Sequence, residues 1–135
     1  LNLFDRTDNG INMPAAMEYT GPMSIVVMRD YPMVDRDRWH YFSFSNGRIV
    51  TAYVDPADGM SKSALHDLTA YSHKAGCAEM ALKVAEIFLA DDFDSDMLRA
   101  LSDQQIHAVW CQDKELYRTQ SDLTLIVTDT TYTKK

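Results

Sequence analysis

The longest run of regularly spaced apolar positions lies in residues 61–90. Small and branched apolar residues recur there at intervals of three and four, which places them on one face of a helix. These positions are Leu65, Leu68, Ser72, Ala75, Ala78, Leu82, Ala85 and Leu89. Asp58-Gly59 supplies a turn beforehand, and Ser61 or Ser63 supplies an N-cap. The pattern predicts a long helix over 61–90, with a kink or break near Gly76.

A second pattern predicts a β-hairpin. Aromatic and β-branched residues fill 39–45 and 48–55, and Asn46-Gly47 lies between the two stretches. Asn-Gly tolerates the two positive φ angles of a type I′ turn, so we expect a two-residue loop. The sequence therefore predicts two antiparallel strands at 39–45 and 48–55.

A two-residue loop fixes which hairpin residues are opposite one another. It pairs Phe44 with Ile49 and Phe42 with Thr51, and both faces of the ribbon are then apolar. A sheet that is apolar on both sides must be covered on both sides or leave one side for a partner. The helix over 61–90 covers one face, which leaves the second face for another segment or another molecule.

The remaining segments give two more strands and an N-terminal arm. The apolar run 23–29 predicts a strand buried on both faces, and the β-branched run 122–131 predicts a final strand. Residues 1–22 are punctuated by Asn9-Gly10, Pro14 and Gly21-Pro22, which indicates an irregular arm.

Two shorter helices are expected between residues 95 and 118. Asp94 or Ser95 can cap a helix over 95–101, and Ser102 with Gln105 has the form of a capping box for a helix over 103–118. A strand over 107–112 is the alternative for the second of these segments.

Together these elements predict one α+β domain over residues 1–135. A small antiparallel sheet would pack against the long helix and the shorter C-terminal helices, with the strand order left open. The hairpin would pair with the first and last strands.

The net charge of −7 is concentrated in one part of the chain. Residues 55–103 contain ten acidic residues against Lys62, Lys74, Lys83 and Arg99. An acidic surface repels nucleic acids and anionic membranes, and no stretch approaches the roughly 18 apolar residues that span a bilayer. The charge fits a basic protein partner or a solvated surface. We expect a cytoplasmic protein, although a chain that begins with Leu1 also fits a processed, exported one.

Candidate chemistry is sparse. Two acidic stretches, at Asp5–Ala16 and Asp92–Asp103, resemble the calcium-loop spacing only in part, because they lack the glycine or the final glutamate. His66 and His73 are seven residues apart, which is too far for a cooperative metal pair on a helix. We therefore expect no metal site, no cofactor and no catalytic residues. Cys77 and Cys111 are expected to be buried thiols, with a disulfide as the alternative.

The favoured function is a non-enzymatic protein that acts by protein–protein interaction, such as an inhibitor, an immunity-type protein or an adaptor. The predicted partner-binding residues are aromatic anchors on the hairpin and acidic residues that attract a basic partner. They are Trp39, Tyr41, Phe42, Phe44, Tyr53, Asp91, Asp92, Asp94 and Asp96.

Two alternatives stay open. One is a small-molecule-binding protein or enzyme with a pocket between the 39–55 hairpin and the 61–90 helix, using His40, Tyr53, His66 or His73. The other is a homodimer in which two sheets meet across the uncovered face.

Overall fold

The computed structural model describes part of the chain. The described residues are 1–7, 10–18, 21–29, 41–43, 45–46, 49–51, 57, 64–65 and 67–135. The strands are β1 (Asn2–Thr7), β2 (Gly10–Met17), β3 (Ser24–Arg29), β4 (Tyr41–Ser43), β5 (Ile49–Thr51), β6 (Asp67–Ser72), β7 (His107–Gln112), β8 (Glu115–Arg118), β9 (Leu125–Val127) and β10 (Thr133–Lys134). The helices are α1 (Cys77–Phe88), α2 (Ser95–Ala100) and the 3-10 helix η1 (Leu101–Gln104). This is an α+β fold.

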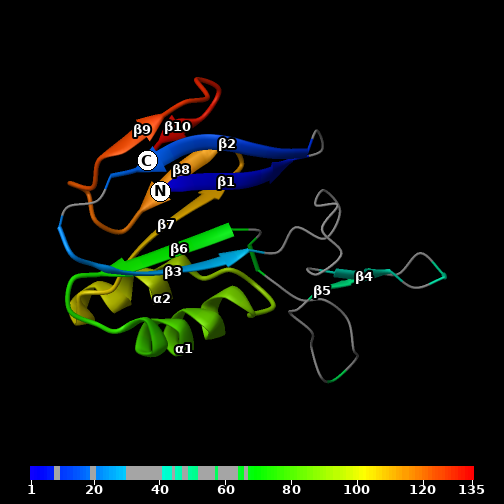
Figure 1. Ribbon diagram of the computed structural model, residues 1–135, viewed down its shortest axis with the longest axis horizontal. Coiled ribbons are helices and arrows are strands. Elements are labelled where there is room, and N and C mark those ends of the chain that lie inside the picture. Colours follow the sequence, from blue (N-terminus) through cyan, green and yellow to red (C-terminus); the bar gives the residue numbers. More distant parts are fainter. Residues whose placement is uncertain are drawn as a thin grey trace.

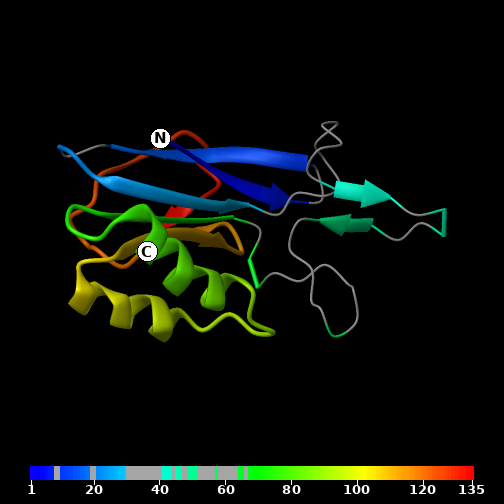
Figure 2. The same cartoon turned by 60° about the horizontal axis from the view of Figure 1, so that its bottom comes forward.

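The elements form three layers (Figure 1). The middle layer is a sheet of five strands in the order β10-β8-β7-β6-β3, in which β10 runs parallel to β8 and the other neighbours are antiparallel. A three-stranded sheet, β1-β2-β9, covers one face of it. The helices α1 and α2 cover the opposite face, as Figure 2 shows from another side.

The predicted helix over 61–90 is wrong in its first half. Residues 67–72 form β6, all of whose residues are buried, and among the described residues of this range only Cys77–Phe88 is helical. Leu68 and Ser72 are four residues apart, which places them on one side of a strand and also on one face of a helix, so this spacing fits both structures. The break expected near Gly76 is confirmed, because Gly76 is the N-cap of α1. Ser61 and Ser63 lie outside the described residues.

The turn between β6 and α1 is stabilised locally. The Ser72 hydroxyl accepts hydrogen bonds from the backbone N–H groups of Lys74 (3.0 Å) and Ala75 (2.9 Å). A serine that bonds to the backbone two and three residues ahead favours a turn over a continuing helix. Ser72 therefore helps to end the strand at a position where the apolar spacing predicted helix.

The predicted helix over 103–118 is also wrong, and the alternative strand over 107–112 is confirmed. β7 and β8 form a hairpin in which Gln112 pairs with Glu115. Asp113 and Lys114 connect them with φ angles of 51° and 61°, the left-handed conformations that a two-residue turn requires. Ser102 does not cap a helix. Its hydroxyl is buried and has no hydrogen-bond partner in the described part of the chain.

Residues 1–22 contain the β1–β2 hairpin where an irregular arm was expected. Leu3 pairs with Ala15 but Asp5 pairs with Asn12, so Met13 and Pro14 together lie opposite one residue of β1. This β-bulge accommodates a proline, which cannot donate to a ladder. The Pro14 carbonyl accepts hydrogen bonds from the backbone N–H groups of Thr128 (2.8 Å) and Asp129 (3.1 Å).

The bulge also changes which side chains of β2 point inward. Ala15 and Met17 are buried between the sheets at odd positions, whereas Asn12 comes inward at an even position because one residue has been inserted. The bulge thereby brings Asn12 into the polar cluster described below.

The 39–55 hairpin exists but differs in register and in neighbours. β4 and β5 pair with each other in a separate two-stranded sheet and with no other described strand. Their pairs, Tyr41 with Thr51 and Phe42 with Val50, are symmetric about Asn46. An odd number of residues therefore separates each pair, and the predicted two-residue turn is wrong, as is the pairing of Phe42 with Thr51. Residues 39, 40, 44, 47–48 and 52–55 lie outside the described residues.

Two predicted elements are confirmed with shorter bounds. β3 lies within 23–29, and α2 lies within 95–101 with Asp94 as its N-cap. The strand predicted over 122–131 is limited to β9, which pairs with β2, and β10 follows at Thr133–Lys134 beside β8. Neither strand joins the β4–β5 hairpin, contrary to the expected strand neighbours.

Candidate functional site

The four predicted acidic residues lie at the connection between α1 and α2. Asp91 and Asp92 follow α1, and Asp94 and Asp96 begin α2, with all four side chains exposed. The Asp94 carboxylate accepts a hydrogen bond from the backbone N–H of Asp96 at 3.0 Å. Carboxylates at this end of a helix stabilise it through its macrodipole. Asp94 and Asp96 therefore have a structural role, whereas Asp91 and Asp92 add charge to the surface.

The outer face of α1 extends this acidic surface. Glu79, Leu82 and Glu86 follow one another at helical spacing on that face, and Leu82 is 76% exposed. Lys83 is the cation between them. It forms an ion pair with Glu79 at 2.8 Å and a hydrogen bond to Gln104, which connects α1 to η1.

We call this region the acidic helical surface. It consists of exposed side chains of α1, α2, η1 and the segment that joins α1 to α2. They are Glu79, Leu82, Glu86, Asp91, Asp92, Asp96, Met97 and Asp103. Between residues 77 and 104, seven acidic residues are opposed by Lys83 and Arg99. Met97 is 46% exposed, so the surface has two exposed apolar side chains among its carboxylates.

The aromatic half of the predicted site stays a prediction. Trp39, Phe44 and Tyr53 lie outside the described residues. Tyr41 and Phe42 are in β4, whose backbone is described without the positions of its side chains. The combination of aromatic and acidic residues in one binding surface therefore stays a prediction.

Sequence analysis missed a polar cluster between the two sheets. The Tyr132 hydroxyl donates a hydrogen bond to the Asp5 carboxylate at 2.6 Å and accepts one from the Asn12 amide at 3.3 Å. The Cys111 thiol also bonds to Asp5. Burial raises the pKa of Cys111, and so do the charge of Asp5 and its hydrogen bond. Burial and the hydrogen bond to Asp5 raise the pKa of Tyr132 as well.

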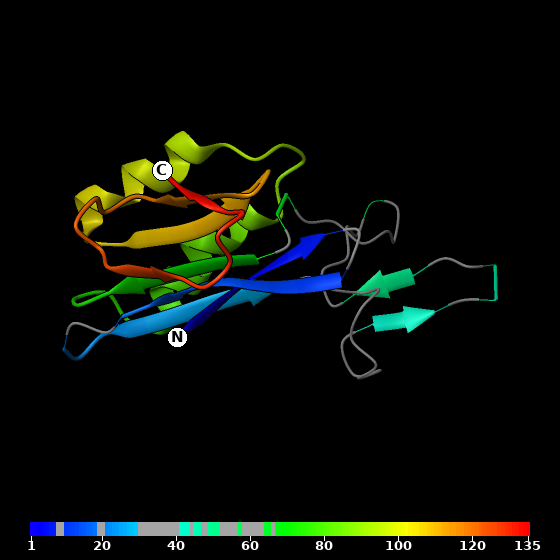
Figure 3. The ribbon, with the colours of Figure 1, turned by 90° about the horizontal axis from the view of Figure 1, so that it is seen from above.

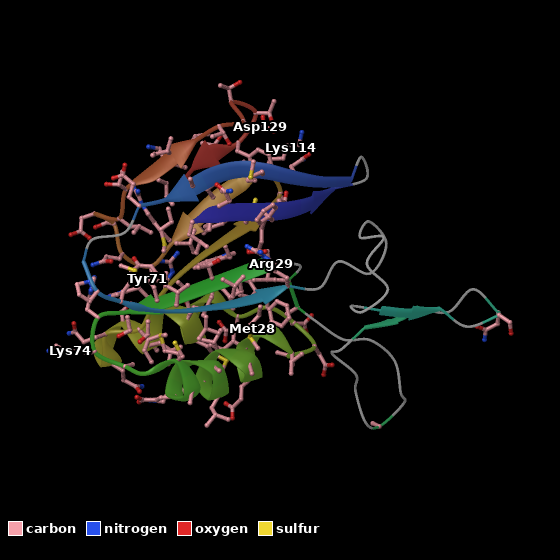
Figure 4. All side chains as sticks on the ribbon, in the orientation of Figure 1. Met28, Arg29, Tyr71, Lys74, Lys114 and Asp129 are labelled. Carbon is pink, nitrogen blue, oxygen red and sulfur yellow. The ribbon has the colours of Figure 1, made fainter. Side chains whose placement is uncertain are left out.

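A second cluster lies at the far end of the same interface. Figure 4 places Tyr71 and Arg29 at opposite ends of the paired strands β3 and β6, as their register requires. The Tyr71 hydroxyl donates to the Gln120 side chain at 2.6 Å, and burial raises the pKa of Tyr71 to about 12. Its ring lies 5.5 Å from that of His107, whose pKa is lowered by burial.

The two clusters hold their protons at neutral pH. A raised pKa keeps Cys111 as a thiol and Tyr71 and Tyr132 as phenols, and a lowered pKa keeps His107 neutral. A thiol is a poor nucleophile compared with a thiolate. These residues therefore stabilise the interface between the sheets and are poorly suited to nucleophilic catalysis.

The other candidates are placed as follows. Cys77 is exposed and Cys111 is half-buried, and both are free thiols, so the expectation of two buried thiols is wrong for Cys77.

His73 lies in the turn after β6 rather than on a helix, and its Nδ1 lies 2.8 Å from the Pro22 carbonyl oxygen. Within the described ranges, no three His, Cys, Asp or Glu side chains are grouped closely enough to hold a metal ion.

The helices bear on the expectation that no segment of the chain spans a membrane. None of the helices in the described part of the chain is both long enough and apolar enough to cross a bilayer.

The polar clusters left no local sequence signal. Asp5, Asn12, Cys111 and Tyr132 are separated by up to 127 residues in the chain and meet only through strand pairing. The stretch that begins at Asp5 was weighed as part of a calcium loop, but it forms the β1–β2 hairpin.

The chain was also compared with known proteins. No protein-family model matches it, and no match was found among curated proteins or solved structures.

Proposed function

We propose that this protein binds a basic protein partner through the acidic helical surface. The observation that carries the proposal is the position of Leu82, 76% exposed and flanked by Glu79 and Glu86 on the outer face of α1. An exposed apolar side chain beside carboxylates has the form of an interface anchor, because the charges steer the partner while the apolar group provides the contact.

The charge pattern supports this assignment. The cation in the middle of α1, Lys83, already pairs with Glu79, so the exposed carboxylates of Glu86 and Asp92 add net negative charge to this surface. A concentration of like charge raises the association rate of an oppositely charged protein and makes binding sensitive to salt. The aromatic residues of the 39–55 hairpin remain the proposed second part of the interface.

The alternative of a small-molecule pocket between the hairpin and the helix depends on the helix predicted over 61–90. It required a helix over 61–90 facing the hairpin, but residues 67–72 form the strand β6, between β3 and β7.

The test is a comparative capture from cell lysate followed by measurement with the purified partner. The variant Glu86→Lys with Asp92→Lys reverses two charges on the acidic helical surface, and neither residue caps a helix. The control variant, Glu18→Lys with Asp122→Lys, makes the same change in net charge at exposed residues outside the helical layer.

We expect the wild type and the control to retain a basic protein that the first variant loses. Isothermal titration with that purified protein should give a dissociation constant about tenfold higher for the first variant, and the dissociation constant of the wild type should rise from about 0.05 M to about 0.5 M salt. Leu82→Ala should weaken binding without changing its salt dependence. Equal loss in both charge variants, or binding that salt does not affect, would contradict the proposal.

A further inference from the structure

The two sheets are joined by the segment that follows β9. β9 belongs to the three-stranded sheet and β10 to the five-stranded sheet, so residues 130–135, which we call the strap, cross from one sheet to the other. Figure 3 shows the strap in red, seen from above, between β9 and the edge of the five-stranded sheet. Its first end is fixed, because the backbone N–H groups of Thr128 and Asp129 both donate to the Pro14 carbonyl of the β-bulge.

A single buried side chain anchors the strap. Tyr132 is 4% exposed, whereas the other side chains of the strap are exposed. Tyr132 packs in the apolar cluster between the sheets, and its hydroxyl donates to the Asp5 carboxylate of β1. The burial of this one ring therefore accounts for the apolar contribution of the strap to stability.

The ties between the strap and β8 are short and lie at the surface. The Thr133 N–H donates to the Lys114 carbonyl at 3.0 Å, and the Lys135 N–H donates to the Leu116 carbonyl at 2.8 Å. The Lys135 ammonium forms an exposed ion pair with Glu115 at 3.3 Å, a kind of pair that stabilises little. In contrast, β6 and β7 pair with a strand on both sides. A segment with so few buried contacts opens at a lower free-energy cost than the strands beside it.

The Cys111 thiol shares its surroundings with the strap. The Asp5 carboxylate bonds to both the Tyr132 hydroxyl and the Cys111 thiol, and Cys111 packs against the cluster that contains Tyr132. Cys111 also pairs with Leu116, whose carbonyl accepts the hydrogen bond from Lys135. Opening the strap would therefore remove the Tyr132 ring and hydroxyl from beside the thiol.

We propose that the strap is a gate, which opens about Asp129 while both sheets stay folded and thereby controls the access of solvent reagents to the Cys111 thiol. The closed strap withdraws Cys111 from oxidants and electrophiles. Cys77, at the start of α1, is exposed and lies outside this control. The strap lies at the sheet edge opposite β3, so the gate is independent of the acidic helical surface on the helices.

Thr133 offers a test that alters neither Asp5 nor Cys111. Thr133→Pro removes the N–H that donates to Lys114, and Thr133→Ala keeps it and is the matched control. Both are made with Cys77→Ser, which leaves Cys111 as the one thiol of the chain. Thr133→Pro should raise the rate at which a disulfide reagent labels Cys111 by about fivefold, because the lost hydrogen bond favours the open strap. Thr133→Ala should label at the rate of the Cys77→Ser parent.

Urea separates the opening of the strap from global unfolding and needs no variant in the strap. The labelling rate of Cys111 should rise with urea along a slope well below that of global unfolding, because the slope scales with the surface exposed. Amide exchange of Thr133 and Lys135 should follow the same weak dependence, whereas the amides of β6 should exchange only on global unfolding.

Two results would overturn the proposal. One is labelling of Cys111 along the full slope of global unfolding, which would mean that the strap does not open separately. The other is equal labelling of folded Thr133→Pro and Thr133→Ala, which would mean that the thiol is reached by another route. Neither result bears on the binding of a basic partner.

Discussion

The two faces of the five-stranded sheet are built from the same strands but hold different chemistry. Under the helices, Leu68 and Ala70 of β6 and Trp110 of β7 pack in a cluster of apolar side chains. Between the sheets, the alternate residues of the same strands include Asp67, which is bonded to Arg29 at 2.7 Å, and Cys111. Alternation along each strand thus separates a core held by packing from an interface held partly by hydrogen bonds. We expect the stability of the core under the helices to depend on side-chain volume, and the stability of the interface between the sheets to depend on pH.

The largest effect is expected on the helix-covered face. Leu68 is fully buried, so Leu68→Ala should lower the free energy of unfolding by about 2–5 kcal/mol, through lost transfer energy and the cavity it leaves. Leu82→Ala, in the same layer but exposed, should change it by less than about 0.5 kcal/mol. Urea denaturation of both variants measures the contrast, and equal losses would mean that the core does not depend on packing here.

A smaller effect is expected between the sheets. Tyr132→Phe removes the hydroxyl that Asp5 and Asn12 share, at a cost of about 1–3 kcal/mol. The pKa of Tyr132 is raised above its usual 10, so its stabilising contribution is lost as pH rises beyond that value. The stability difference between wild type and Tyr132→Phe should therefore narrow above pH 10. A constant difference up to alkaline pH would show that the hydroxyl does not titrate with folding.

The smallest effect is expected at His107, at the other end of this interface. Burial lowers its pKa below the usual 6.5, the charge of Asp122 opposes that shift, and His73 adds to it. The unfolded chain therefore binds the proton first, and stability falls as pH drops below 6.5 towards the lowered pKa. His107→Phe should flatten this slope in urea denaturation measured from about pH 5 to pH 7. An unchanged slope would assign the acid sensitivity to other groups.

The same two faces explain which elements the sequence could predict. β3 and α2 had local signals, a short apolar β-branched run for the strand and Asp94 or Ser95 as a cap for the helix, and both elements were found. β6 did not. Its residues alternate, Asp67 and Thr69 against Leu68 and Ala70, but Leu68 and Ser72 are also four residues apart, and this spacing continued the helical pattern of the following residues. The helix predicted over 103–118 failed because Asp113-Lys114 is an unusual pair for a turn that requires positive φ angles.

The candidate site divides in a similar way. The acidic residues 91–96 could be predicted as exposed because charge is local and rarely buried. The cluster of Asp5, Asn12, Cys111 and Tyr132 could not, because it depends on strand order and on a single inserted residue in β2.

That inserted residue has a consequence for anyone who aligns or redesigns this strand. The inward and outward alternation of β2 side chains shifts by one residue between the part before Met13 and the part after Pro14. A sequence alignment that assumes strict alternation would therefore assign Asn12 to the solvent. Deleting either residue would restore a single alternation along β2 and turn the side chains of the first half of the strand to the opposite face. The amide that bonds to Tyr132 would then point outward, although no residue of the cluster itself had been altered.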